Sequence, residues 1–193
     1  RWLFMCAIPI SIVFILFPEK VLLLFGEEYI SSAQILIILT LATCIQAILG
    51  AAGPTLSMAG YTKLVLWNTI GAFILNFGLN IYLIPEHGVM GAAIATFISL
   101  TVVGLARVIE VGIILKISFI NRKIFKPIIA GILTVIGLGL LKNSLMAYHT
   151  LVTLALAGIL SLGIFGITMW ILKIEEEDLD FFKGLGVFKR NSN

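Results

Sequence analysis

The sequence predicts an all-α integral membrane protein with about six transmembrane helices, and two features of the chain lead to this fold class. Hydrophobic residues make up 60% of the 193 residues and charged residues only 12%, whereas an ordinary soluble domain carries about 25% charged residues. Several apolar runs also reach or exceed the ~20 residues that cross the hydrocarbon core of a bilayer. With a mean hydropathy of +1.14, the chain is expected to have lipid as its solvent.

The first half of the chain contains two expected spans and a shorter element between them. The run 2–17 is slightly short for a full crossing and ends at Pro18, while the run 33–53 ends in a cluster of helix breakers at Gly50, Gly53 and Pro54. Between the two runs, residues 18–32 carry an apolar patch flanked by charges. Because this patch is too short to span, we expect an interfacial or re-entrant element that turns at Gly26.

Four further spans are expected after the loop that contains Gly60. The runs are 64–84, 89–115, 124–141 and 151–172. Pro85 and Gly88 lie between the first two of them, so these spans should form a tight antiparallel hairpin. Gly91, Ala95 and Ser99 then recur every four residues, a spacing that favours close helix packing. Residues 173–193 are polar and should form a cytoplasmic tail.

Positive charges predict the orientation of the chain, because lysines and arginines collect in cytoplasmic loops. Most of the cations lie in alternate segments, which hold Arg1, Lys63, Lys116, Arg122, Lys123, Lys126, Lys173, Lys183, Lys189 and Arg190. The opposite segments hold only Lys20 and Lys142. We therefore expect a multi-pass protein of the cell membrane with its C-terminus in the cytoplasm. The chain begins at Arg1 without an initiating Met or a signal peptide, which suggests that helices of the same chain precede it.

Enzyme chemistry, a metal site and a cofactor find little support in the residues. Cys6 and Cys44 lie inside apolar runs and are expected to pack as small hydrophobic residues. His87 and His149 have no carboxylate or thiol at metal-ligand spacing. The cations are dispersed between apolar runs, which argues against a nucleic-acid partner. We expect no metal, no cofactor and no enzyme activity.

Three amides on the third span are candidate substrate-binding residues. Asn68, Asn76 and Asn80 are spaced by eight and four residues, so they lie near one face of a helix. Such a face could line a polar cavity that receives a hydrophilic head group. It could equally hold the bundle together through hydrogen bonds between helices. The second alternative is the more frequent use of amides in membrane helices.

Arg107 and Glu110 are the charged candidates on the fourth span. They are three residues apart, and an unpaired charge at the centre of the bilayer costs about 2.5–3.5 kcal/mol on insertion scales, so we expect the two side chains to pair. Arg107 is also close enough to the cytoplasmic end of the span to reach the interface. The alternative role is contact with an anion inside a cavity.

The third and fourth spans carry a pattern that resembles a known family. The pattern is Asn68-x-x-Gly71-x4-Asn76-x3-Asn80-x-x-Leu83-Ile84-Pro85-x-x-Gly88-x-x-Gly91-Ala92-Ala93-x-Ala95-Thr96-x-x-Ser99, with Phe25-Gly26-x-x-Tyr29 and Gly60-x-x-Lys63 before it. It resembles the C-terminal half of the polysaccharide flippases, which belong to the multidrug/oligosaccharidyl-lipid/polysaccharide exporter superfamily. The resemblance covers about residues 1–120, and the last two spans agree with it only in topology.

The resemblance implies a carrier that moves a lipid-linked oligosaccharide or polysaccharide precursor by alternating access between two helical lobes. Residues 1–117 would supply helices of the second lobe, and 118–172 two additional transmembrane helices. The implied partners are membrane lipid, the lipid-linked oligosaccharide, a possible coupling ion and the preceding helices of the same chain. Two alternatives stay open: a multidrug and toxin extrusion antiporter, which needs a membrane carboxylate such as Glu110, and a polytopic glycan ligase or glycosyltransferase.

Overall fold

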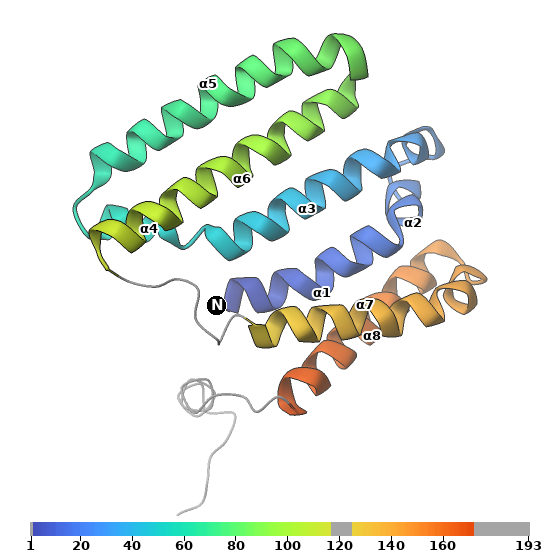
Figure 1. Ribbon diagram of the computed structural model, residues 1–193. Helices are drawn as coiled ribbons and strands as arrows, with labels where there is room; N and C mark the ends of the chain where they lie inside the picture. The colour runs from blue at the N-terminus through green and yellow to red at the C-terminus, as the bar shows by residue number, and fades with distance from the viewer. Residues whose placement is uncertain (1, 117–124, 172–193) are drawn as a thin grey trace, which may run out of the picture.

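The computed structural model describes residues 2–116 and 125–171, and within these ranges the chain is built from helices without any strand (Figure 1). This confirms the predicted all-α fold class. In chain order the elements are α1 (Trp2–Leu16), α2 (Pro18–Leu23), the 3-10 helix η1 (Glu27–Ser32), α3 (Ala33–Leu49), α4 (Ala52–Met58), α5 (Thr62–His87), α6 (Val89–Ile114), α7 (Phe125–Met146) and α8 (Thr150–Ile171).

The described residues contain five segments that are long and apolar enough to cross a membrane, and they include α3, α5, α6, α7 and α8. The first of the six expected spans is shorter, because α1 has 15 residues. At 1.5 Å per residue it extends about 22 Å, which is less than the ~30 Å of the hydrocarbon core. The chain is therefore a multi-pass membrane protein by the length and composition of its helices.

The long helices form a row in which each packs against its neighbours. α5 packs on α6, α6 on α3, α3 on α1, and α1 on both α7 and α8, while the short α4 contacts α5 and α6 (Figure 1). α5 therefore stands at one edge of the row. No residue of α5 is buried, so this helix keeps a broad surface open beyond its contact with α6.

Two prolines do not end helices where the sequence predicted. The expected span 33–53 is divided, because α3 ends at Leu49 and a second short helix, α4, contains Pro54 in its first turn. A first-turn proline removes no helical hydrogen bond. Pro85 lies inside α5, which continues to His87. The helix ends at Gly88, whose φ of 57° favours glycine, and α6 starts directly after it. The predicted hairpin is present, and its turn is shorter than expected.

The remaining helix boundaries follow the predicted runs closely. The segment 18–32 contains α2 and η1 with Gly26 between them at a φ of 139°, as its expected turn requires. α7 continues five residues beyond the predicted end at 141 and includes Lys142. The expected tail 173–193 lies outside the described residues.

Small residues on α6 permit close helix packing, as their spacing predicted. Gly91, Ala95 and Ser99 are all buried. A Cβ on Gly91 would overlap the carbonyl oxygen of Leu83 on α5, and a Cβ on Gly104 would come within 2.9 Å of the Leu49 side chain on α3. Small side chains therefore let α6 approach helices on both of its sides.

Candidate functional site

Polar side chains gather where α6 crosses the N-terminal part of α5. Asn68 Nδ2 donates a hydrogen bond to Glu110 Oε2 at 2.5 Å, and Arg107 Nη2 donates one to Thr69 Oγ1 at 3.1 Å. Arg107 and Glu110 thus bind neighbouring residues of α5 instead of each other. The expected ion pair between them is not formed, because both side chains cross to the adjacent helix.

The Arg107 guanidinium makes few polar contacts for a charge inside a membrane span. Its side chain is half-buried, and its Nε is buried without a hydrogen-bond partner. Thr69 supplies its only polar contact within the described residues. A guanidinium has five N–H donors, so most of the hydrogen-bonding capacity of Arg107 is unused in the part of the chain that the structure describes.

Gly53 on α4 forms a wall of this site. A Cβ at this position would lie 3.4 Å from Arg107 Nη1 and 3.7 Å from its Cδ, which is ordinary van der Waals contact. Gly53 itself is buried. The side chain of Arg107 therefore lies between the backbone of α4 and the hydroxyl of Thr69. We define the α4–α5–α6 site as Gly53, Asn68, Thr69, Arg107 and Glu110.

The other two amides of α5 form a separate pair. Asn80 Nδ2 donates to Asn76 Oδ1 at 2.8 Å, and Asn80 Oδ1 is buried without a partner. Both side chains are half-buried. The predicted amide face thus contains one hydrogen bond between helices, made by Asn68, and one within α5. The structure brings Asn68, Arg107 and Glu110 together and leaves Asn76 and Asn80 further along the helix.

The depth of these groups follows from the helix rise of 1.5 Å per residue. Asn68 lies about 9 Å from the start of α5 at Thr62, and Arg107 about 10 Å from the end of α6 at Ile114. Both helix ends carry lysines, Lys63 and Lys116. The α4–α5–α6 site is therefore near the lysine-bearing end, while Asn76 lies about 21 Å from Thr62.

Two members of the site were missed by sequence reasoning. Thr69 follows Asn68 directly, but a threonine in an apolar helix ordinarily bonds its own helix, as the Thr69 hydroxyl also does by donating to the Val65 carbonyl at 2.9 Å. Gly53 was interpreted only as a helix breaker. The pairing of α4 with α6 is a long-range contact, and no local pattern identifies it.

The described residues contain no cluster of three or more His, Cys, Asp or Glu side chains that could hold a metal ion. His87 lies 3.9 Å from Glu86 in the exposed end of α5. Cys44 is a half-buried free thiol. These groups are far apart in the chain and form no common site.

Comparison with known proteins finds two relatives in archaea. The chain is 27% identical over 175 residues to an uncharacterized membrane protein of Methanocaldococcus jannaschii. The aligned segment covers 86% of this chain and 32% of the relative. It is 30% identical over 96 residues to a probable low-salt glycan biosynthesis flippase of Haloferax volcanii. This aligned segment covers 49% of this chain and 20% of the relative. The chain thus spans a third or less of either protein.

Neither of the other two comparisons gives a match: no family model matches the chain, and no solved structure does. The relatives support a membrane protein and agree with its apolar helices.

Proposed function

We propose that this chain is part of a flippase that moves a lipid-linked oligosaccharide or polysaccharide precursor across the cell membrane by alternating access. The observation that carries the proposal is Arg107, a cation within a membrane span that has one hydroxyl partner and a buried Nε without any. Cations within spans are costly and are typical of substrate or ion pathways. The Haloferax relative, named as a probable glycan biosynthesis flippase, supports the same class of function.

The chemistry of a lipid-linked sugar suits this group of side chains. Its phosphate or pyrophosphate needs a cation that can form charge-assisted hydrogen bonds, and a guanidinium offers a planar set of donors for that purpose. Its sugar hydroxyls need hydrogen-bond donors and acceptors, which an amide supplies together. Asn76 and Asn80 are half-buried on the same helix as Thr69. In this proposal Arg107 binds the phosphate, and the amides of α5 contact sugar hydroxyls.

The position of α5 supports access for such a substrate. α5 stands at the edge of the row and packs only against α6 and α4 among the contacts described, so further helices or lipid would cover its remaining surface. Bilayer-spanning helices tolerate a polar path only where protein or water lines it. Because the chain spans a third or less of either relative, we propose that further helices of a longer protein complete this path.

A second candidate function is a cation-coupled antiporter of the multidrug and toxin extrusion type. Glu110 favours it, because this carboxylate lies within a span and accepts a hydrogen bond from Asn68 without an ion-pair partner in the described residues. A carboxylate in that setting could bind Na⁺ or a proton. The two functions differ in which charge is essential for transport.

The decisive experiment compares Arg107→Ala with Glu110→Gln in the full-length protein. Surface glycan export and protein abundance are measured together in cells that depend on this protein. For the flippase, Arg107→Ala should lower export by tenfold or more at unchanged abundance, since an anion loses a charge-assisted contact. Equal losses of export and abundance for Arg107→Ala would reduce its role to packing and end the proposal.

The same pair of variants tests the antiporter. Glu110→Gln should keep export of the glycan within a few-fold of wild type if Glu110 only bonds Asn68, because a glutamine oxygen also accepts that hydrogen bond. Loss of ion-driven drug efflux in Glu110→Gln, with glycan export intact in Arg107→Ala, would favour the antiporter.

A further inference from the structure

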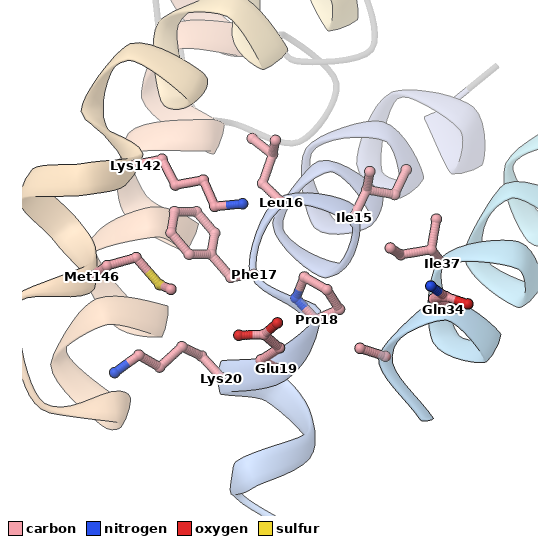
Figure 2. Close-up of a pocket in the computed structure, with 11 residues that line it drawn as sticks. Ile15, Leu16, Phe17, Pro18, Glu19, Lys20, Gln34, Ile37, Lys142 and Met146 are labelled. Atoms are coloured by element: carbon pink, nitrogen blue, oxygen red, sulfur yellow. The ribbon is translucent and has the colours of Figure 1, made fainter. Parts of the chain in front are cut away.

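A pocket with charged and apolar walls lies at the opposite end of the helices from the α4–α5–α6 site. It has a volume of about 270 Å³ and forms where the end of α1, the start of α2, the start of α3 and the C-terminal part of α7 meet (Figure 2). The lysines of the other end, Lys63 and Lys116, are far from it. Every element that lines this pocket begins or ends there, which places the pocket at the level of the helix ends rather than in the middle of the bundle.

Two cations from different elements line this pocket. Lys142 comes from α7 and Lys20 from α2, and these are the two lysines that stand apart from the cation-rich segments in the sequence. Figure 2 shows the Lys142 side chain extending from α7 toward Leu16 and Phe17, with Glu19 and Lys20 on α2 below them. Two cations that are more than a hundred residues apart in the chain therefore line one pocket, with the Lys20 ammonium pointing away from Lys142 toward the carbonyl of Tyr148.

These lysines retain most of their capacity to bind an anion. Lys142 is half-buried and has no hydrogen bond or ion pair within the described part of the chain. Lys20 donates a long hydrogen bond of 3.4 Å to the Tyr148 carbonyl. It forms no ion pair within the described residues. Glu19 is the one carboxylate in the lining, so the pocket carries a net positive charge.

The other residues that line the pocket form an apolar wall beside a polar one, which suits an amphipathic ligand. Phe17 is only 1% exposed and lines the pocket together with Leu16 and Met146. Gln34 adds an exposed amide from the start of α3. A free anion would leave the apolar wall uncovered, whereas a lipid would cover it with the upper part of its hydrocarbon chain.

We propose that this pocket binds the phosphate of a lipid head group that also carries hydroxyl groups. Lys142 contacts the phosphate, and the flexible side chain of Lys20 rotates from the Tyr148 carbonyl to reach it. Glu19 and Gln34 accept hydrogen bonds from the hydroxyls, and the hydrocarbon lies against Leu16 and Met146. Two kinds of lipid carry a phosphate beside hydroxyl groups: a glycerol phospholipid of the bilayer and a lipid-linked sugar phosphate. The evidence for this pocket is separate from that for transport, because none of its lining residues belongs to the α4–α5–α6 site.

The test measures lipid binding to the full-length protein in detergent by native mass spectrometry. Phosphatidylglycerol is the probe, since it carries a phosphate and two free hydroxyls, and uncharged diacylglycerol is the matched lipid. Each lysine near an anionic lipid contributes about fivefold to binding. Lys142→Gln should therefore raise the dissociation constant for the first phosphatidylglycerol about fivefold, and Lys20→Gln/Lys142→Gln about twenty-five-fold.

Matched controls separate the charge effect from misfolding. Lys142→Arg keeps the charge and should bind as wild type, and Lys63→Gln, at the other end of the helices, should leave the first dissociation constant within twofold. Diacylglycerol binding should not change in any variant. Wild-type affinity for phosphatidylglycerol in the double variant would overturn the proposal, as would equal losses for phosphatidylglycerol and diacylglycerol.

A competition arm distinguishes the two lipid sources. A polyprenyl-phosphate-linked sugar is added at increasing concentration to the protein with bound phosphatidylglycerol. Displacement that Lys142→Gln weakens would identify a lipid-linked sugar phosphate as an occupant. Binding of phosphatidylglycerol that resists the competitor would identify the bilayer phospholipid.

Discussion

Asn68 on α5 donates a 2.5 Å hydrogen bond to the carboxylate of Glu110 on α6, and this bond joins the edge helix of the row to its neighbour. Arg107 makes a parallel connection one turn earlier on α6 through Thr69. Because lipid offers no polar groups to replace these bonds, they contribute to helix association as well as to the polarity of the site. The α4–α5–α6 site is therefore both a junction and a candidate binding site.

Removal of the Asn68–Glu110 bond should weaken the contact between the two helices measurably. In a double-mutant cycle of Asn68→Ala and Glu110→Ala, we expect a coupling energy of about 0.6 kcal/mol, with an upper bound near 1.7 kcal/mol. The measurement is reversible unfolding of the purified full-length protein in mixed micelles with SDS. Purely additive effects of the two substitutions would mean that the hydrogen bond contributes nothing to stability.

Gly91 provides a second test of how α5 and α6 pack. A Cβ there would overlap the Leu83 carbonyl oxygen, so Gly91→Ala should destabilise the hairpin by about 1–3 kcal/mol through overpacking. Gly112→Ala on the same helix is the matched control, because a Cβ at Gly112 meets nothing within 4 Å. Thermal unfolding in detergent compares the two variants, and equal melting temperatures would contradict the close approach at Gly91.

The charge pattern predicts the orientation of the chain, and labelling tests it. We expect a cysteine at Ser192 to lie in the cytoplasm, since the segments that share its side of the membrane carry most of the lysines and arginines. In a variant without Cys6 and Cys44, a membrane-impermeant thiol reagent should label Ser192→Cys only after cells are opened. Asn143→Cys, near the end of α7 on the opposite side, should react in intact cells. The reverse pattern would invert the topology.

Helix positions were largely predictable from the sequence because one physical property sets them. Long apolar runs must be helical in lipid. The predicted run 89–115 differs from α6 by one residue at its C-terminal end, and the run 151–172 differs from α8 by one residue at each end. The exact ends were less predictable. Pro85 reads as a terminator, yet α5 continues through it to Gly88, where a positive φ ends the helix. Proline is tolerated in membrane helices, so its presence alone does not fix a boundary.

The candidate residues were predictable, but their partners were not. Amides and charged side chains are rare inside apolar runs, because placing them in the membrane costs free energy. This rarity makes Asn68, Arg107 and Glu110 recognisable in the sequence. Spacing on one helix favoured a pair between Arg107 and Glu110, whereas the actual partners lie on α5. Which residues of two helices meet depends on their crossing and register, and the sequence of either helix does not contain that information.

Thr69 offers the sharpest test of whether Arg107 is held in place for a substrate. Its hydroxyl accepts the hydrogen bond from Arg107 Nη2 at 3.1 Å. Valine has nearly the shape of threonine and lacks the hydroxyl, so Thr69→Val removes this contact with little change in volume. A hydrogen bond to a charged group contributes about 1.5–3 kcal/mol. We therefore expect Thr69→Val to leave abundance unchanged and to reduce export at limiting substrate by about tenfold.

Thr69→Ser is the matched control, because serine keeps the hydroxyl and should preserve export. Thr55→Val on α4 is a second control, since the Thr55 hydroxyl bonds only the Ala51 carbonyl of its own helical segment within the described residues. If Thr69 positions Arg107, the loss should be largest at low substrate and shrink as substrate rises, because a misplaced guanidinium weakens binding first. A loss of the same size at every substrate level would mean that Thr69→Val acts on a later step of transport. Unchanged export at every substrate level would show that the Arg107–Thr69 contact does not prepare Arg107 for an anion.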